Sequence, residues 1–155
     1  MPDFAVSLVR TAEEMREALA VRRAVFIEEQ EVPEALEIDE HDGDPALINT
    51  ALHVLRRLNG EAVATGRLLL EDDHGNAHIG RVAVLRDHRG RGYGRAVMAA
   101  LHRLSRERDC AGITLAAQLH AIGFYERFGY VVRSDVYLDA GIEHRWMDLR
   151  FDNER

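Results

Sequence analysis

A glycine-rich stretch near the middle of the chain combines residue types that bind phosphate. Glycines alternate with other residues over 90–94, and arginines stand close to them. Alternate glycines allow a tight turn in which several backbone N–H groups point to one place. An apolar run over 79–84 precedes the turn, and a segment of helical periodicity follows it. A helix starting there adds its unpaired N–H groups and the positive end of its dipole. The pattern predicts a pyrophosphate site on Arg89, Gly90, Arg91, Gly92, Tyr93, Gly94 and Arg95.

Two familiar phosphate motifs do not match this stretch. A Walker loop needs a Gly-Lys pair, and the chain contains no lysine. The dinucleotide fingerprint needs a third glycine three residues after the second. Counting from Gly90 and Gly92, that position holds the bulky Arg95, where close packing of helix on strand is required. A P-loop is therefore excluded, and a dinucleotide site is disfavoured.

The composition is that of an ordinary globular domain. With 155 residues the chain is long enough for a proper core, and we expect one domain over 1–155. No apolar stretch approaches the length of a membrane-spanning helix, and the N-terminus lacks the regions of a signal peptide. One cysteine, Cys110, cannot form an internal disulfide. These features predict a cytoplasmic protein that does not bind membranes.

Charge is distributed unevenly along the chain. The net charge of −7 argues against general nucleic-acid binding. Residues 28–44 hold nine carboxylates and no arginine, whereas residues 81–108 hold eight arginines and two carboxylates. Such a separation indicates two ligands of opposite charge. The alternative is a pair of solvated surfaces, and charge alone does not decide between the two.

Hydrophobic periodicity predicts a mixed α/β (α+β) fold with helices on both faces of the sheet. Thr11 and Glu14 form a capping box at the start of a first helix, and Asn59-Gly60 indicates a hairpin turn. A polar, carboxylate-rich loop is expected over 34–44. Strands are predicted over 4–9, 51–58, 61–70, 77–84, 113–117, 130–137 and 143–151, and further helices over 25–30, 93–108 and 121–128.

Two motifs together resemble those of the GNAT superfamily of N-acetyltransferases. Arg89-x-x-Gly92-x-Gly94 matches the acetyl-CoA signature Gln/Arg-x-x-Gly-x-Gly/Ala. One strand later, residues 121–130 match Ala-x-x-Phe/Leu-Tyr-x-x-x-Gly-Phe/Tyr. Two further segments, 25–30 with Asp39 and Asp42, and 141–147, resemble the ElaA-like branch. The resemblance covers nearly the whole chain.

The resemblance implies a fold and a cofactor site. The sheet would be mixed and largely antiparallel, with six or seven strands, a central parallel pair that splays apart, and about four flanking helices. Acetyl-CoA would lie in the gap with its pantetheine arm along one splayed strand and its pyrophosphate on the glycine turn. Tyr125 would be the general acid that protonates the departing sulfur. The implied cofactor-binding residues outside the turn are Val82, Ala83, Val84, Phe124 and Arg127.

The acceptor side is less defined by sequence. The carboxylates of 28–44 would favour a small cationic amine. Glu28, Glu29, His120 and His144 are alternative bases for removing its proton. Asp39 and Gln118 are further substrate-binding candidates, although the family often has Asn where this chain has Gln118. A metal site is not supported, because ordinary solvation explains His74 and His78 beside Asp72 and Asp73.

The expected function is therefore acetyl transfer from acetyl-CoA to a primary amine, most simply on a small molecule. One alternative keeps the chemistry and makes the acceptor a protein or peptide amine. Another is a non-catalytic module that senses acyl-CoA. The expected partners are the small-molecule amine and, as an open expectation, a second copy of the chain, but not nucleic acid.

Overall fold

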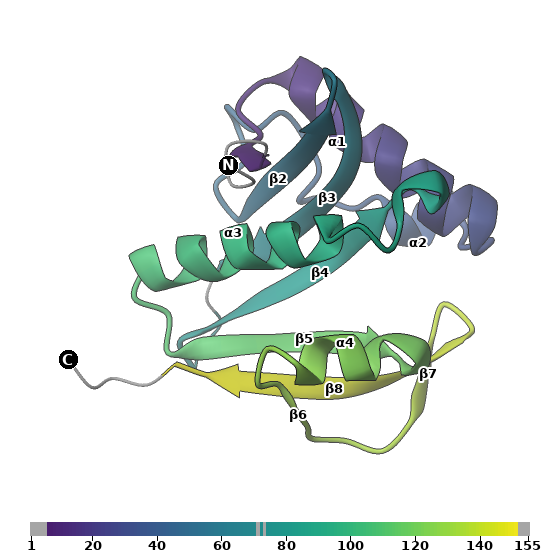
Figure 1. Ribbon diagram of the computed structural model, residues 1–155. Helices are drawn as coiled ribbons and strands as arrows, with labels where there is room; N and C mark the ends of the chain where they lie inside the picture. The colour runs from purple at the N-terminus through teal and green to yellow at the C-terminus, as the bar shows by residue number, and fades with distance from the viewer. Residues whose placement is uncertain (1–5, 71, 73, 152–155) are drawn as a thin grey trace.

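The computed structural model describes residues 6–70, 72 and 74–151, and its centre is one mixed sheet (Figure 1). Eight strands lie in the order β1-β2-β3-β4-β5-β8-β6, and β7 also pairs with β8. Only β4 and β5 are parallel, so the predicted largely antiparallel sheet with one parallel pair is confirmed, with more strands than expected. The strands are β1 (Val6–Leu8), β2 (Ala51–Leu58), β3 (Glu61–Leu69), β4 (Asn76–Val84), β5 (Gly112–Gln118), β6 (Val131–Val132), β7 (Tyr137–Asp139) and β8 (Ile142–Arg150).

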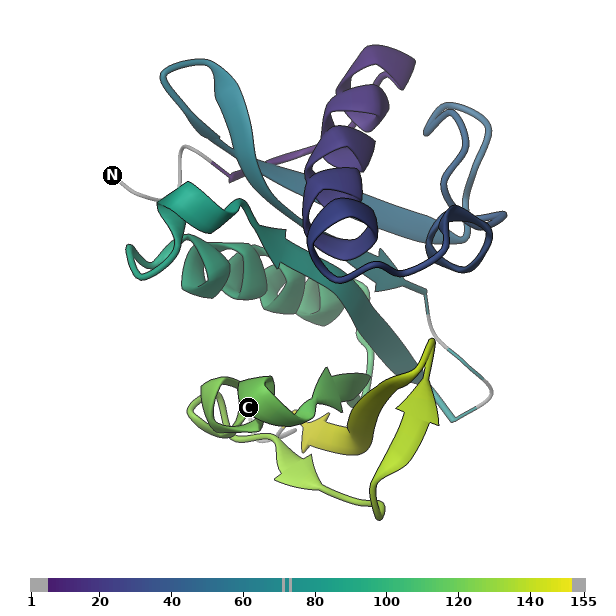
Figure 2. The same cartoon turned by 90° about the vertical axis from the view of Figure 1, so that its right-hand side faces the viewer.

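Helices cover both faces of this sheet. Figures 1 and 2 show α1 (Ala12–Arg22) and α2 (Glu34–Glu37) on one face, and α3 (Tyr93–Glu107) and α4 (Ile122–Glu126) on the other. Short 3-10 turns η3 (Arg86–His88) and η4 (Leu119–Ala121) precede α3 and α4. Among the described helices, none combines the length and apolar character that a bilayer crossing requires.

The first helix starts as predicted and ends differently. Thr11 Oγ1 accepts from the Glu14 N–H (3.1 Å), and the Glu14 carboxylate accepts from the Thr11 N–H (3.2 Å), which is the predicted capping box. The helix does not break before Val25. It continues directly into a π-helix, η2 (Arg23–Glu29), in which the Gln30 N–H donates to the Val25 carbonyl oxygen (3.1 Å). The separate helix predicted over 25–30 is therefore the widened end of one continuous segment.

Two other boundaries differ from the sequence expectation. The loop predicted over 34–44 contains α2, and two of its carboxylates, Glu37 and Asp42, are buried. The strand predicted over 130–137 is split into β6 and β7, which pair with different parts of β8. Between them the chain bends away from the sheet, and Ser134 Oγ accepts from the Trp146 N–H (2.9 Å). Residues 4 and 5 of the first predicted strand lie outside the described residues.

The parallel strands β4 and β5 touch only at their beginnings. Three residue pairs, from Asn76↔Gly112 to His78↔Thr114, hold them together, and β4 continues for six further residues without pairing with β5. In Figure 1 the two strands meet at one end and diverge toward the other. The predicted splay is confirmed, and it leaves the β5-facing edge of β4 without a neighbouring strand.

A β-bulge lies within the part of β4 that has separated from β5. Between Thr65↔Ala83 and Arg67↔Gly80, β4 contains one more residue than β3. Arg81 absorbs this extra residue with a φ of +55°, a left-handed conformation that is uncommon for a residue with a side chain. The bulge changes which way the β4 backbone and side chains point directly beside the gap.

The core between α3 and the sheet is closely packed and encloses a histidine. A Cβ on Gly66 would lie 2.7 Å from Val97 Cγ1, so only glycine lets α3 approach β3 this closely. His102, at 7 % exposure, faces the same core, and its Nε2 lies 2.8 Å from the Tyr130 hydroxyl. Burial, with a smaller effect from Arg106, lowers the pKa of His102 to about 4. Burial likewise lowers the pKa of His53 to about 4.

These two histidines predict that the fold loses stability in mild acid. Above an ordinary His pKa of about 6.5, both states are neutral and stability is unaffected. As pH falls from that value toward 4, the unfolded chain takes up protons that the native chain excludes. At pH 5 each histidine should cost about 2 kcal/mol relative to pH 7.5. Urea unfolding of wild type and His102→Gln at both pH values measures this loss of stability. His120→Gln, which changes an exposed histidine, is the control. Equal stability of wild type at both pH values would contradict the assignment.

Candidate active site

A cleft of about 960 Å³ opens where β4 and β5 separate, and most of the predicted site residues line it. Figure 2 views the molecule from the side on which the ends of these strands lie apart. Three predicted residues are not part of this lining. Arg91 is exposed, Glu28 borders a smaller hollow beside η3, and Asp39 is held in ion pairs. The predicted residues in the lining are Glu29, Val82, Ala83, Val84, Arg89, Gly90, Gly92, Tyr93, Gly94, Arg95, Gln118, His120, Phe124, Tyr125, Arg127 and His144.

The glycine turn has the backbone geometry that its sequence indicates. Gly90 (φ +80°) and Gly92 (φ +87°) are both left-handed. Gly92 is the N-cap of α3 and provides no side chain to cap it, so the first intrahelical bond runs from the Ala96 N–H to the Gly92 carbonyl oxygen (3.0 Å). The preceding N–H groups of the helix have no intrahelical acceptor and carry the positive end of its dipole. This is a site suited to an anion.

Arg89 already has partners on both sides of the turn. Its two terminal nitrogens each donate to the Glu29 carboxylate at 2.7 Å, and its Nε donates to the Val84 carbonyl oxygen at 2.9 Å. Arg89 thus links the end of η2 to the end of β4. The same contact lowers the pKa of Glu29 to about 2. Arg89, which was predicted to bind the cofactor, is therefore paired with Glu29, which was predicted to bind the acceptor.

Backbone groups of β4 provide a second binding element. Beyond His78 no described strand pairs with the edge of β4 that faces β5, so its N–H and C=O groups can bond an extended ligand as a further strand would. Across the gap, Phe124 packs against the start of α3, where a Cβ on Gly94 would lie 3.5 Å from its ring. The cleft wall thus combines an open strand edge with an apolar wall from α4.

Tyr125 lies on α4 at the same cleft. Its ring is half-buried and makes edge-to-face contacts with Phe124 (5.1 Å) and Tyr130 (5.9 Å). Burial raises the pKa of Tyr125 to about 12. No described residue makes a hydrogen bond with its hydroxyl. Tyr125 is therefore a protonated donor at neutral pH whose hydrogen is available to a ligand.

His144 lies on the α1 side of the sheet with one ring nitrogen held by the backbone. Its Nδ1 lies 2.7 Å from the Ile142 carbonyl oxygen, which can only accept, so in the neutral ring Nδ1 carries the hydrogen and Nε2 has the lone pair. The His144 ring is tilted by 30° against the Tyr137 ring, with 6.0 Å between the ring centroids. Its neighbour across the sheet, Gln118, exchanges side-chain hydrogen bonds with Gln30 (2.9 and 3.3 Å). Gln118 therefore joins β5 to the end of η2.

The other candidate bases are less suited to accept a proton. The ion pair with Arg89 keeps Glu29 ionised as a weak base, because its pKa is about 2. Glu28 is exposed and outside the cleft lining. His120 lines the cleft but is exposed, and no described residue fixes its ring.

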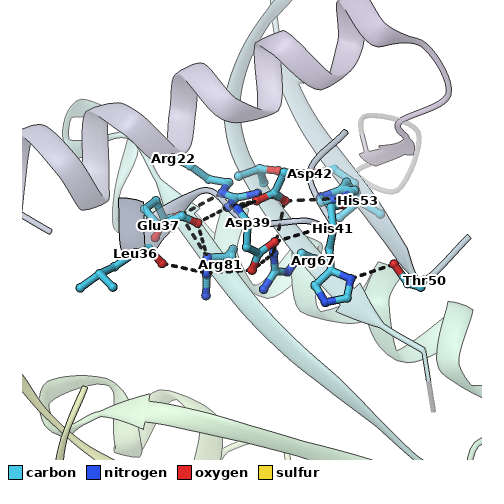
Figure 3. A network of polar contacts seen from close by, with 12 residues as sticks. Arg22, Leu36, Glu37, Asp39, His41, Asp42, Thr50, His53, Arg67 and Arg81 are labelled. Carbon is cyan, nitrogen blue, oxygen red and sulfur yellow. Dashed lines mark hydrogen bonds and ion pairs between the residues drawn. The ribbon is translucent and has the colours of Figure 1, made fainter. Parts of the chain in front are cut away.

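A network of three arginines and three carboxylates, most of them buried, lies below α1 (Figure 3). Arg22 is 1 % exposed and bonds Glu37 (2.9 Å) and Asp42 (2.7 Å). Burial raises the pKa of Glu37 against the effect of its arginine partners. Burial also acts to raise the pKa of Asp42, but the hydrogen bonds and charge of Arg22, the Asp39 N–H and the charge of Arg67 together hold that pKa far below its usual range. The remaining members are Asp39, Arg67 and Arg81.

This network changes the interpretation of the acidic segment. Three of its nine carboxylates are neutralised inside the protein, Glu29 pairs with Arg89, and Glu34 pairs with Arg23 (2.7 Å). The segment is therefore neither a solvated acidic surface nor a set of free carboxylates over the cleft. Much of its charge holds α1, α2 and β3 together.

Several cleft residues were not identified as site residues from the sequence. Arg67 and Arg81 line the cleft beside Gly80, and Trp146 forms part of the opposite wall. A usable signal existed for Arg67, because a charged residue interrupts the otherwise apolar strand over 63–69. Within the described residues no group of three or more His, Cys, Asp or Glu could hold a metal ion.

Comparison with known proteins identifies the family. Residues 12–130 match the model of the Acetyltransferase (GNAT) family. YjcF of Bacillus subtilis (strain 168), described as an uncharacterized N-acetyltransferase, is 36 % identical over 141 residues, which are 90 % of this chain and 95 % of YjcF. The crystal structure of Escherichia coli ElaA superposes with a TM-score of 0.81 at 30 % identity, covering 92 % of this chain and 97 % of ElaA.

A further solved structure is an acyl-CoA N-acyltransferase from Pseudomonas aeruginosa. Its TM-score is 0.79 at 29 % identity, over 92 % of this chain and 97 % of that protein. These matches extend across both motifs, the splayed strands and the acidic segment. The chain belongs to the GNAT family of acyl-CoA-dependent acyltransferases, in the ElaA-like branch.

Proposed function

We propose that this protein is an N-acetyltransferase that moves the acetyl group of acetyl-CoA to the primary amine of a small molecule, which is cationic in its ammonium form. The observation that carries the proposal is one cleft lined by the unpaired start of α3, the open edge of β4, Tyr125 and His144. The solved relative from Pseudomonas aeruginosa is described as an acyl-CoA N-acyltransferase, which supports the same class of donor.

The residues present fit the donor. The N–H groups of Tyr93, Gly94 and Arg95 would hold the pyrophosphate, with Arg95 and Arg127 adding positive charge at the cleft wall. The open edge of β4 over 82–84 would pair with the pantetheine amides, except at the Val84 carbonyl oxygen, which Arg89 already occupies. When bound, acetyl-CoA supplies the acetyl group, which passes to the amine nitrogen as the C–S bond breaks.

The chain's own residues handle the protons of the reaction. His144 Nε2, directly or through a water molecule, takes the proton that the ammonium must lose before its nitrogen becomes a nucleophile. Backbone N–H groups of β4 beside the bulge polarise the carbonyl group. Tyr125 donates to the sulfur as negative charge develops there. The acceptor nitrogen loses two protons, one before the attack and one from the adduct afterwards; one of them replaces the proton that Tyr125 gives to the sulfur, and the other is released to solvent.

The acidic segment offers a cationic acceptor few carboxylates that are free of arginine. The expectation of a cation was based on the acidic segment, yet only Glu28, Glu31, Glu40 and Asp44 lack an arginine partner among the described residues. All four are exposed to solvent. The ammonium group therefore owes little to long-range attraction by this segment.

Two measurements test the function. Isothermal titration with acetyl-CoA measures donor binding, and a thiol-release assay over a panel of primary amines and peptides measures turnover. Turnover on small amines supports the proposal, and turnover on peptides alone would assign a protein or peptide acceptor. Tight binding without turnover on any acceptor would favour an acyl-CoA sensor.

Substituting Gly92 should weaken donor binding. A valine there would place a branched side chain over the unpaired N–H groups of α3 and block close approach of a phosphate. We expect the Kd for acetyl-CoA to rise at least about tenfold, equivalent to one lost charge-assisted hydrogen bond. Isothermal titration of Gly92→Val measures the change.

Gly60→Val is the matched control for backbone strain. Gly60 has φ +85° and open space around its Cα, as Gly92 has, but it lies in the β2–β3 turn outside the cleft. Both variants should lose a similar amount of stability, about 1–2 kcal/mol. If Gly92→Val and Gly60→Val bind acetyl-CoA equally well, the glycine turn is not the phosphate site.

A further inference from the structure

Among the three arginines of the network, Arg67 has its whole Nε–Nη2 edge without partners within the described residues. The three donor nitrogens of Arg22 all have acceptors on Glu37 or Asp42. In Arg81, Nε and Nη2 both donate to the 36–39 segment. In Arg67, Nη1 contacts Asp39 (2.9 and 3.0 Å) and Asp42 (3.2 Å), whereas Nε is buried without a partner and Nη2 has none among the described residues.

The unpaired edge of Arg67 has a specific chemistry. The Nε–H and Nη2–H bonds of a guanidinium point in the same direction, and this pair is one of the forks that binds a carboxylate or phosphate through two parallel hydrogen bonds. Arg67 is only 4 % exposed, so water provides little compensation for these donors. A buried donor without an acceptor is unfavourable, and such a group usually indicates a missing partner.

The position of Arg67 places this edge at the acceptor side of the cleft. Gly66 faces α3, so its neighbour Arg67 points to the opposite face, toward α1. Its partner across β3 and β4 is Gly80, and no atom lies within 4 Å of a Cβ built there. Gln118 and His144, which pair across β5 and β8, are on this same face. Together with Arg67 and Gly80 they line the cleft.

The charges around Arg67 permit an anion. The three arginines of the network balance the carboxylates of Glu37, Asp39 and Asp42. His53, 3.9 Å from Asp42, adds no charge near neutral pH, because burial lowers its pKa to about 4. A ligand oxyanion on the free edge of Arg67 therefore meets no uncompensated negative charge in the network.

We propose that the acceptor amine also carries an oxyanion, a carboxylate or a phosphate, which binds the Nε–Nη2 edge of Arg67 while the amine faces His144. The substrate class is thus an amino acid or an aminoalkyl phosphate, and not a simple amine or polyamine. This inference rests on the proposed function, and it assigns Arg67 as a specificity-determining residue.

Matched pairs of acceptors test the class. Glycine, β-alanine and γ-aminobutyrate, each beside its own amide, vary the distance between amine and carboxylate while removing only the negative charge. Aminoethyl phosphate beside ethanolamine tests phosphate in the same way. We expect kcat/KM to be about 10- to 100-fold higher for at least one oxyanion-bearing member than for its neutral partner, the range of a charge-assisted bidentate contact. Equal or higher kcat/KM for every neutral partner would overturn the proposal.

Arg67→Lys tests the residue. Lysine keeps a positive charge for Asp39 and Asp42 but lacks the second donor edge. The preference for the oxyanion-bearing acceptor should fall at least tenfold in a folded variant. Arg23→Lys changes a partly exposed arginine at the start of η2, paired with Glu34 outside the cleft, and should keep the preference. An unchanged preference in folded Arg67→Lys would also overturn the proposal.

A binding measurement separates this inference from the proposed function. N-acetyl-β-alanine and N-acetyl-β-alaninamide, and N-acetylated aminoethyl phosphate, are titrated into wild type and Arg67→Lys with CoA present. If no amine is turned over but an N-acetylated oxyanion binds wild type at least tenfold more tightly than the amide, the proposed function fails and the Arg67 site stands. If the oxyanions bind no better than the amide, the Arg67 site fails even where turnover of simple amines is observed.

Discussion

Replacing Tyr125 with phenylalanine should lower kcat by about 10²- to 10⁴-fold, the usual contribution of a general acid. The change removes one hydroxyl and keeps the ring that packs against Phe124 and Tyr130. The Kd for acetyl-CoA should change little, because the hydroxyl matters only when charge develops on the departing sulfur. Steady-state thiol release and isothermal titration measure the two quantities on the same preparation.

Tyr130→Phe is the matched control for this substitution. It also removes a phenolic hydroxyl, but Tyr130 is buried, bonds His102 (2.8 Å), and is not part of the cleft lining. It should reduce stability and leave kcat within a few-fold of wild type. A Tyr125→Phe enzyme with full kcat would show that solvent protonates the sulfur without this residue.

The pH dependence gives a second test of Tyr125. Its functional form is the protonated one, which persists until pH rises through a pKa of about 12. Deprotonation of Tyr125 therefore cannot reduce the rate between pH 7 and pH 10. Any loss of rate in that interval that is also present in Tyr125→Phe belongs to another group.

Local chemistry explains why part of this site could be predicted from sequence. A left-handed backbone strongly favours glycine, so the alternating glycines Gly90 and Gly92 indicate a left-handed turn. The capping box at Thr11 and the hairpin at Asn59-Gly60 are likewise decided by residues a few positions apart. The backbone conformation at these three places therefore depends little on the rest of the fold.

Pairing between distant segments explains what the sequence did not reveal. The acidic segment looked like a surface for a cation, because a count of charges does not show that Arg22 and Arg67, 20 and 25 residues from Asp42, would neutralise it. The pairing of Glu29 with Arg89 spans 60 residues. The excursion between β6 and β7 has no local signal, because it depends on how these two strands pair with separate parts of β8. The π-helical end of the first helix likewise has no signal in the sequence pattern.

Replacing His144 with glutamine should reduce kcat/KM by about 10²- to 10⁴-fold for an amine that is protonated at the assay pH, because it removes the base. Glutamine can still bond the Ile142 carbonyl oxygen but offers no basic nitrogen where His144 has Nε2. His120→Gln is the control, since His120 lines the same cleft with an exposed, unfixed ring, and it should stay within a few-fold of wild type.

Acceptors of graded basicity distinguish a lost base from a disturbed structure. An amine whose own pKa lies below the assay pH arrives without the extra proton and needs no base, whereas a strongly basic amine needs one for every turnover. The ratio of wild-type to His144→Gln kcat/KM should therefore shrink as the amine pKa decreases. A merely structural role would lower kcat/KM for all amines by the same factor. A constant ratio across the series would remove His144 from the reaction and leave His120, or solvent alone, to take the proton.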